Sequence, residues 1–299
     1  MQTIDVKHVA YVERYTSIQE FEQVFDSRRT RVDDGEDHFA MNYRSNDEWW
    51  SGYSDGARLR SDFEKSKVND NTLTAMQSDL SQVKMAPQTR VRHYNAEAGI
   101  MVDTDAYLNG DPECFINIRK EKSPGRTIKV LVNTGVVCSL SVEEITEGGR
   151  AIVKALAGLE SKGFRTELSV GWLMGMPPRK NSQAVDRVGG MTILVKRSSE
   201  PFNLTRIAWP MITPAFSRGV GFGWYDRCDK IPYGSHYGRA YNYIDSYIVD
   251  EFERQLNKKG EIVLSVDRVC NWIRDGRDVE EAIKNEVDRA IALSREVRH

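Results

Sequence analysis

The centre of the chain reads as one strand, one helix and a second strand, and this pattern constrains the fold more than any other. Thr127–Val132 is rich in β-branched and aliphatic residues, which favours a strand. Ser141–Lys162 has apolar residues at helical spacing and opens with a capping box of Ser141 and Glu144. Phe164–Val170 reads as the second strand. Because strands joined by a helix lie parallel in one sheet, the chain is predicted to be an α/β protein.

Further elements continue this pattern toward the C-terminus. Gly190–Arg197 and Leu204–Trp209 are predicted strands, joined by a hairpin over Ser198–Asn203. Glu261–Val266 is a late strand, and Asp278 is placed to cap the final helix. We therefore expect a three-layer fold, with one sheet carrying helices on both faces.

The N-terminal part carries helix signals. Ser17 and Glu20 form a second capping box, and the spacing of Leu73, Met76 and Leu80 is typical of an amphipathic helix. The predicted organisation is a helical N-terminal region over 1–87, a connecting strap over 88–126 and the α/β domain over 127–299.

Composition excludes several classes of protein. The net charge of −2 argues against a globally basic nucleic-acid coat. No apolar run approaches the ~20 residues that cross a bilayer, and the N-terminus lacks the apolar core of a signal peptide, so we expect a cytoplasmic protein without a membrane partner. The four cysteines form no CxxC pair and the five histidines show no zinc-binding spacing. We expect no metal and no cofactor.

The loop after the first core strand, Asn133–Leu140, occupies the usual ligand position of an open α/β sheet. It has neither GxxxxGK[ST] nor GxGxxG, so no phosphate or dinucleotide site is predicted there. Gly148 and Gly149 lie inside the helix, where we expect them to let it approach the sheet. A Cys138–His236 nucleophile pair is the weak enzymatic alternative, and no catalytic residue is assigned.

A second loop is acidic. Asp103, Asp105, Asp111 and Glu113 surround a turn, but their spacing does not match a calcium loop. We expect a turn capped by side chains.

The segment from Trp209 to Tyr247 is unusually rich in glycine, aromatic residues and arginine. Three interpretations stay open: a surface that stacks single-stranded nucleic acid, a protein interface, and plain structural packing. A short basic segment before the α/β domain is a candidate anion contact. The candidate binding residues are Arg218, Phe222, Trp224, Tyr225, Arg227, His236, Tyr237 and Arg239 in the first segment, and Arg119, Lys120, Lys122 and Arg126 in the second.

Four stretches occur in an order that resembles a group of uncharacterised proteins of tailed bacteriophages. They read EWWSGYSDGARL, GIMVDTDAYLNGDPECF, GGRAIVKALAGLESKGFRTEL and TRIAWPMITPAFSRGVGFGWYD. The resemblance extends from about Trp49 to His236 and implies a phage protein made in the host cytoplasm. It implies no activity.

The strand–helix–strand unit followed by a hairpin strand also resembles the von Willebrand factor A fold, with a Rossmann-like sheet as the alternative. The resemblance implies a metal motif, DxSxS, after the first strand. The corresponding positions here are Asn133, Gly135 and Val137, so the metal site and metal-dependent adhesion are not expected.

We therefore predict a non-enzymatic phage protein that binds phage or host proteins, single-stranded nucleic acid, or both, as a replication or transcription accessory. Self-association is open. The alternatives are an enzyme with an unrecognised active site near Asn133–Ser139 and a structural component of the virion.

Overall fold

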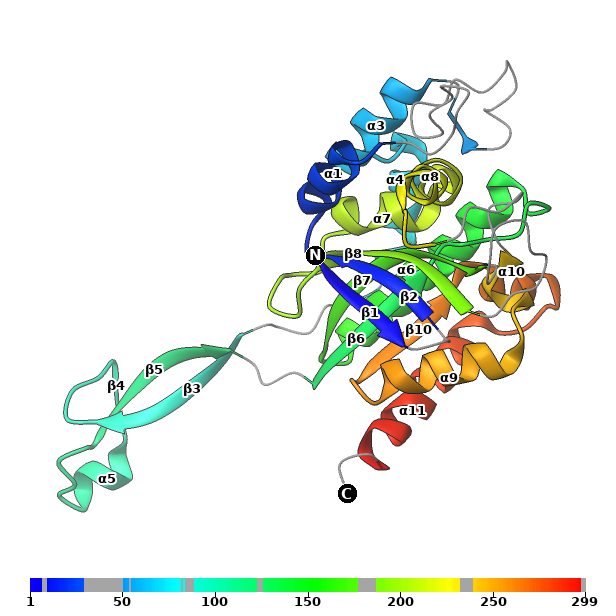
Figure 1. The fold of residues 1–299 in the computed structure, drawn as a ribbon. Helices are drawn as coiled ribbons and strands as arrows, with labels where there is room; N and C mark the ends of the chain where they lie inside the picture. Colours follow the sequence, from blue (N-terminus) through cyan, green and yellow to red (C-terminus); the bar gives the residue numbers. More distant parts are fainter. Residues whose placement is uncertain are drawn as a thin grey trace.

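The computed structural model describes residues 1–6, 10–29, 51–53, 55–81, 83, 89–122, 126–176, 187–231 and 239–296. Its centre is a mixed sheet in the order β1-β2-β8-β7-β6-β10, with a short strand β9 paired to β7 (Figure 1). The strands are β1 Gln2–Val6, β2 Ala10–Tyr15, β6 Arg126–Asn133, β7 Phe164–Met176, β8 Arg187–Lys196, β9 Arg239–Ala240 and β10 Glu261–Ser265.

The predicted strand–helix–strand unit is confirmed. β6 and β7 pair in parallel and are joined by α6, Val142–Ser161. Ser141 and Glu144 form the reciprocal capping box, and Gly163 ends the unit's helix region with a φ of 87°. β10 adds in parallel to β6, and β8 runs antiparallel to β7.

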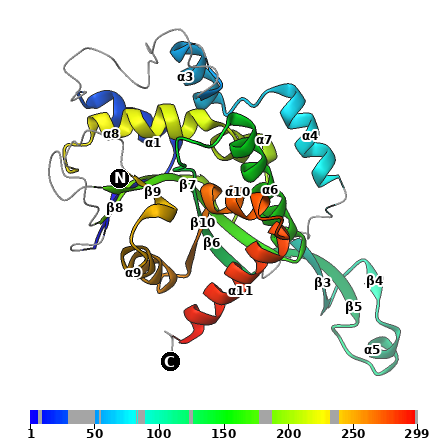
Figure 2. The same cartoon turned by 90° about the vertical axis from the view of Figure 1, so that its right-hand side faces the viewer.

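Helices cover both faces of the sheet, as the sequence predicts. One face carries α6, α7 (Leu204–Ile212), the π-helix η1 (Phe216–Gly221) and α8 (Phe222–Arg227), with α1 (Ile18–Ser27), α3 (Gly56–Lys65) and α4 (Asp70–Leu80) around them. The other face carries the 3₁₀ turn η2 (Tyr241–Tyr243) and α9 (Ser246–Asn257). α10 (Val266–Arg274) and α11 (Val279–Glu296) lie toward the β10 edge (Figure 2). The protein is an α/β protein with three layers.

The glycine pair in α6 serves helix contacts and not an approach to the sheet. A Cβ on Gly149 would lie 2.2 Å from the carbonyl oxygen of Met211 in α7. A Cβ on Gly148 would lie 2.6 Å from Cys270 Sγ in α10. The two glycines therefore let α7 and α10 pack directly on α6.

The predicted strand Leu204–Trp209 is wrong, because this segment is helix α7. The Asn203 side chain accepts a hydrogen bond from Arg206 N at 3.3 Å and caps the helix. Ile207, Trp209 and Met211 are buried in the core. A short apolar run fits either a strand or a buried helix, and the cap decides here for the helix. The predicted hairpin is instead the link from β8 into α7.

The N-terminal region is helical only in part, because it begins with two strands of the main sheet. β2 lies parallel to β8, whose residues come about 180 positions later. α1 begins after Ser17, as predicted, but the Glu20 carboxylate accepts from Thr16 N and not from Ser17 N. The helix predicted from Leu73 onward is α4.

The predicted strap forms a small sheet of its own. β3 (Thr89–Ala96), β5 (Phe115–Lys122) and β4 (Met101–Val102) pair antiparallel in the order β3-β5-β4. The short helix α5, Thr104–Leu108, lies at the far end. Figures 1 and 2 show this unit projecting from the three-layer body. We call residues 89–122 the arm and residues 97–114 its tip.

Candidate functional site

The loop at the carboxyl end of β6 is tied down by hydrogen bonds within the protein. Asn133 is buried, and its Oδ1 accepts from Gly135 N and from Leu173 N, each at 2.9 Å. Thr134 Oγ1 donates to the carbonyl oxygen of Gly171 at 3.0 Å. These contacts fasten the start of the loop to β7.

Two buried charged residues hold the rest of this loop. Asp267, in the first turn of α10, accepts from Val137 N at 3.2 Å. Arg218, in η1, donates through Nη2 to the carbonyl oxygens of Leu140 at 2.7 Å and Val137 at 3.4 Å. Burial lowers the pKa of the Arg218 guanidinium to about 10. Sequence reasoning missed Asp267, although it is the first acidic residue after β10.

The structure describes only one member of the catalytic pair considered for this loop. Cys138 is exposed, while His236, its predicted partner, lies outside the described residues. Within the described part of the chain, no three His, Cys, Asp or Glu residues converge to hold a metal ion.

The predicted stacking rings of the glycine-rich segment, Phe222, Trp224 and Tyr225, pack in or against the core. Trp224 and Tyr225 are both 1% exposed, and Trp224 Nε1 donates to Glu13 at 2.9 Å. Phe222 packs edge-on against Trp172 with ring centroids 5.9 Å apart. Glycine permits this packing, because a Cβ on Gly221 would lie 2.4 Å from the Trp172 ring. The buried rings present no free face on which a nucleic-acid base could stack.

The arginines predicted beside these rings are separated. Arg227 lies over the Phe25 ring, 4.1 Å from its centroid, and donates to the Gly223 carbonyl oxygen at 3.2 Å. Arg239 is exposed on β9, and Arg126 is exposed at the start of β6. Tyr237, like His236, lies outside the described residues.

The remaining predicted residues, Arg119, Lys120 and Lys122, fall on β5 of the arm. In the β3–β5 ladder Arg119 is the register partner of Arg92, and Lys120 is the partner of Val91. All three lie in the half of the arm that adjoins the body.

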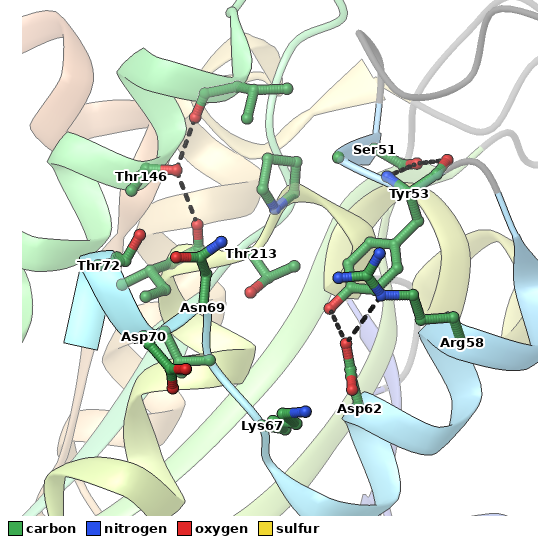
Figure 3. A pocket seen from close by; sticks show the side chains of 15 residues that line it. Ser51, Tyr53, Arg58, Asp62, Lys67, Asn69, Asp70, Thr72, Thr146 and Thr213 are labelled. Atoms are coloured by element: carbon green, nitrogen blue, oxygen red, sulfur yellow. Dashed lines mark hydrogen bonds and ion pairs between the residues drawn. The ribbon is translucent and has the colours of Figure 1, made fainter.

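A polar cavity of about 290 Å³ lies between α3, α4 and the ends of α6 and α7 (Figure 3). Tyr53 crosses one side of it: its hydroxyl accepts from Trp209 Nε1 at 2.9 Å and donates to Asp62 at 3.1 Å. Burial raises the pKa of Tyr53 to about 12. Arg58 Nε lies 3.8 Å from the same Asp62 carboxylate. These groups form hydrogen bonds and an ion pair with one another. We therefore interpret the cavity wall as part of the contact between the N-terminal helices and the core.

The arm tip exposes apolar side chains of the types that are buried in the body. On α5, Leu108 is 76% exposed and Tyr107 is 63% exposed; on and before β4, Ile100, Met101 and Val102 are also exposed. Single exposed apolar residues are ordinary, but the tip has five of them within residues 100–108, and we call these five residues the exposed patch. Aromatic residues and methionine are enriched in protein interfaces.

The tip backbone that carries these side chains is well hydrogen-bonded. Asp103 caps α5 by accepting from Ala106 N at 3.2 Å, and Asp103 N donates to the Cys114 carbonyl oxygen at 2.7 Å. Asp111 accepts from Glu113 N at 2.9 Å. This confirms the predicted turn capped by side chains. The exposed patch is therefore presented on ordered backbone, which lowers the entropic cost of binding.

Residues 3–273 match the model of a family described as a domain of unknown function, DUF7192. The chain belongs to this family. No curated protein and no solved structure matches the chain.

The DUF7192 match includes both the body and the arm. It begins in β1 and ends in α10, so the whole arm lies inside the matched range and α11 lies outside it. Within the described residues of this DUF7192 chain, no helix combines the length and the apolar character that a membrane crossing requires.

Sequence reasoning missed the arm tip as a site. The signal was Ile100–Val102, an apolar run beside an acidic turn and without an apolar neighbour that could cover it. Residues 88–126 are predicted to be a connecting strap, and a connecting segment is not expected to present a binding surface.

Proposed function

We propose that this chain is a non-enzymatic phage protein that acts in the host cytoplasm by binding a protein partner through its arm. The observation that carries this proposal is the cluster of exposed apolar residues on the ordered tip, led by Tyr107 and Leu108. Phage origin rests on the sequence resemblance, and membership of a domain family of unknown function is compatible with it.

The stability of a small sheet supports a binding role for the arm. Isolated two-stranded ribbons are at best marginally stable in water, and small sheets need an apolar face that something covers. The third strand of the arm, Met101–Val102, is only two residues long and exposed. Both outer strands, β3 and β4, also leave one edge unpaired within the sheet. A partner that covers the tip would stabilise the arm as well as bind it.

The loop at the carboxyl end of β6 supports the non-enzymatic part of the proposal. Its polar groups are engaged by Arg218, Asp267 and the β7 backbone. We propose that the core is related to the von Willebrand factor A fold: β8 follows the β6–α6–β7 unit as an antiparallel neighbour. Asn133 stands where that family has the first aspartate of its metal motif, so metal-dependent adhesion is not carried over.

Single-stranded nucleic acid is the second candidate partner, because of the basic half of the arm. Arg119 stands opposite Arg92 in the ladder, and like charges at opposite positions destabilise a strand pair unless an anion lies nearby. The protein partner ranks first because Trp224 and Tyr225, the rings predicted to stack bases, are buried.

Photo-crosslinking in infected bacteria tests the proposal. We would replace Tyr107 with benzoylphenylalanine in the full-length chain and irradiate the cells. Tyr247, 74% exposed on α9, is the matched control because it is another exposed tyrosine, on the body. Nuclease treatment before electrophoresis separates protein adducts from nucleic-acid adducts.

We expect a discrete protein adduct from position 107 and none from position 247. Equal labelling at both positions, or no adduct at 107, contradicts a binding role for the arm tip. An adduct at 107 that nuclease removes favours nucleic acid over protein as the partner.

A further inference from the structure

The two ends of the arm carry opposite charge. The tip, residues 97–114, contains five acidic residues and no lysine or arginine: Glu97, Asp103, Asp105, Asp111 and Glu113. The paired strands below it contain five basic residues and one glutamate: Arg90, Arg92, Arg119, Lys120, Lys122 and Glu121. The basic positions lie toward the body, and the acidic positions lie at the far end.

The tip carboxylates lack cations of their own. Within the described residues, none of the five acidic side chains of the tip takes part in an ion pair. Four of them, all except the half-buried Asp103, are exposed. Figures 1 and 2 show the tip at the far end of the arm, away from the basic half of the same arm.

A second arm laid alongside in the opposite direction satisfies both ends at once. A two-fold axis across the middle of the arm would place each acidic tip on the basic half of its neighbour. Two-fold interfaces use the same patch on both subunits, so one patch must be self-complementary. The arm meets this condition in charge, and the exposed residues of β4 and α5 would be covered in the same contact.

We infer that the partner of the arm is a second copy of this chain, bound arm to arm in an antiparallel two-fold dimer. This inference rests on the proposed binding role of the arm and names the partner. Each eight-residue strand of the arm, β3 and β5, spans about 26 Å. This length lets the tip of one arm lie beside the basic half of the other arm.

Reversing charge on one end at a time tests the arrangement. The tip variant carries Asp105→Lys and Glu113→Lys. The wild-type side chains at these two positions have no hydrogen-bond partner among the described residues. The shaft variant carries Arg119→Glu and Lys120→Glu. The tip variant changes the tip charge from −5 to −1, and the shaft variant changes the charge of the basic half from +4 to 0, so each variant alone loses most of the attraction at both contacts of the dimer. In an equimolar mixture, a heterodimer keeps one wild-type contact, and at its other contact the new lysines lie beside the new glutamates.

Sedimentation velocity of the full-length proteins at about 100 µM gives the readout, because even a micromolar interface is largely formed there. We expect a wild-type dimer, two monomeric variants, and a dimer in the mixture. We also expect Leu108→Ser to weaken the wild-type dimer at least about tenfold and Tyr247→Ser to leave it unchanged. Circular dichroism confirms that each variant is folded.

A monomeric wild-type protein overturns the inference, as does a mixture that stays monomeric. If the wild-type protein is monomeric while position 107 still crosslinks to a different protein, the arm binds a partner and the second copy is not that partner. If the protein dimerises but the charge variants dimerise equally well, the interface lies elsewhere on the chain.

Discussion

The buried carboxylate of Glu13 on β2 offers the sharpest test of what holds the body together. Its Oε2 accepts from Tyr15 OH at 2.5 Å, Arg28 Nη1 at 2.8 Å and Trp224 Nε1 at 2.9 Å. Its Oε1 accepts from Tyr11 OH and Arg28 Nη2, each at 3.0 Å. One side chain thus joins β2, the end of α1 and α8.

Glu13→Gln keeps the shape of the side chain and removes its charge. The new amide nitrogen cannot accept, so in its best orientation it loses the bonds from Tyr11 and from one nitrogen of Arg28. Hydrogen bonds to charged groups contribute about 1.5–3 kcal/mol each, so losing two of them predicts a loss of about 3–6 kcal/mol. With a urea m-value of about 3 kcal/mol/M, the denaturation midpoint falls by roughly 1–2 M.

Urea denaturation followed by tryptophan fluorescence measures this midpoint, and Trp224 reports from beside the substitution. Glu281→Gln is the control because Glu281 is exposed on α11, where substitutions change stability by no more than about 0.5 kcal/mol. Equal midpoints for the two variants would refute the argument that the Glu13 cluster joins these elements.

The same variant predicts a change in acid stability. Burial alone would raise the pKa of Glu13, but the hydrogen bonds from Arg28, Tyr15 and Trp224 outweigh it and hold the pKa below its ordinary value of 4.5. A depressed folded-state pKa gives stability that is present above pH 4.5 and is lost as the pH falls through the folded value. The wild-type advantage over Glu13→Gln should therefore shrink below pH 4.5.

Three further perturbations have defined outcomes. Gly149→Ala should destabilise the protein by about 1–3 kcal/mol, because its Cβ would meet a backbone oxygen of α7, whereas Gly158→Ala in the same helix meets nothing within 4 Å and should stabilise by about 0.5–1 kcal/mol; thermal melts compare the two. Lys196→Met should cost about 3–5 kcal/mol, since it leaves the Glu160 carboxylate buried without the ammonium 2.8 Å away, and adding Glu160→Gln should restore part of the loss in a denaturant titration. Cys138 is exposed and the other three cysteines are buried, so a chromogenic thiol reagent should titrate one fast thiol in the native protein and four after unfolding.

Local signals predicted the elements whose contacts lie nearby in sequence. The α6 unit is the clearest example, because its capping box, apolar stripe and terminal glycine all lie within residues 141–163. The α/β class followed from this unit alone. The strand prediction for Leu204–Trp209 failed because a six-residue segment is too short to show whether its apolar spacing is that of a strand or a helix.

Other features depend on partners far along the chain, and local patterns could not supply them. β2 is a strand because β8 pairs with it, and Glu13 is a core residue because Arg28 and Trp224 bind it. Arg218 is predicted from the sequence as a binding residue, yet it donates to the carbonyl oxygen of Leu140, about 80 residues earlier in the chain. A positive charge in a sequence does not reveal whether its partner is solvent, a ligand or the protein's own backbone.

In the body, charged and apolar groups are paired or covered by the chain itself, whereas the arm leaves such groups exposed. This contrast is the reason to look for function on the arm. In the body, buried charges such as Glu13, Glu160 and Arg218 have partners within the chain, and the aromatic rings of α8 are enclosed. Burying such groups without partners would cost several kcal/mol each, so the body gains stability by being closed. The arm has the opposite character, with apolar side chains in solvent and net charges of opposite sign at its two ends. A surface of that kind costs free energy in the isolated chain, and a partner that covers the apolar residues and neutralises the charge recovers it.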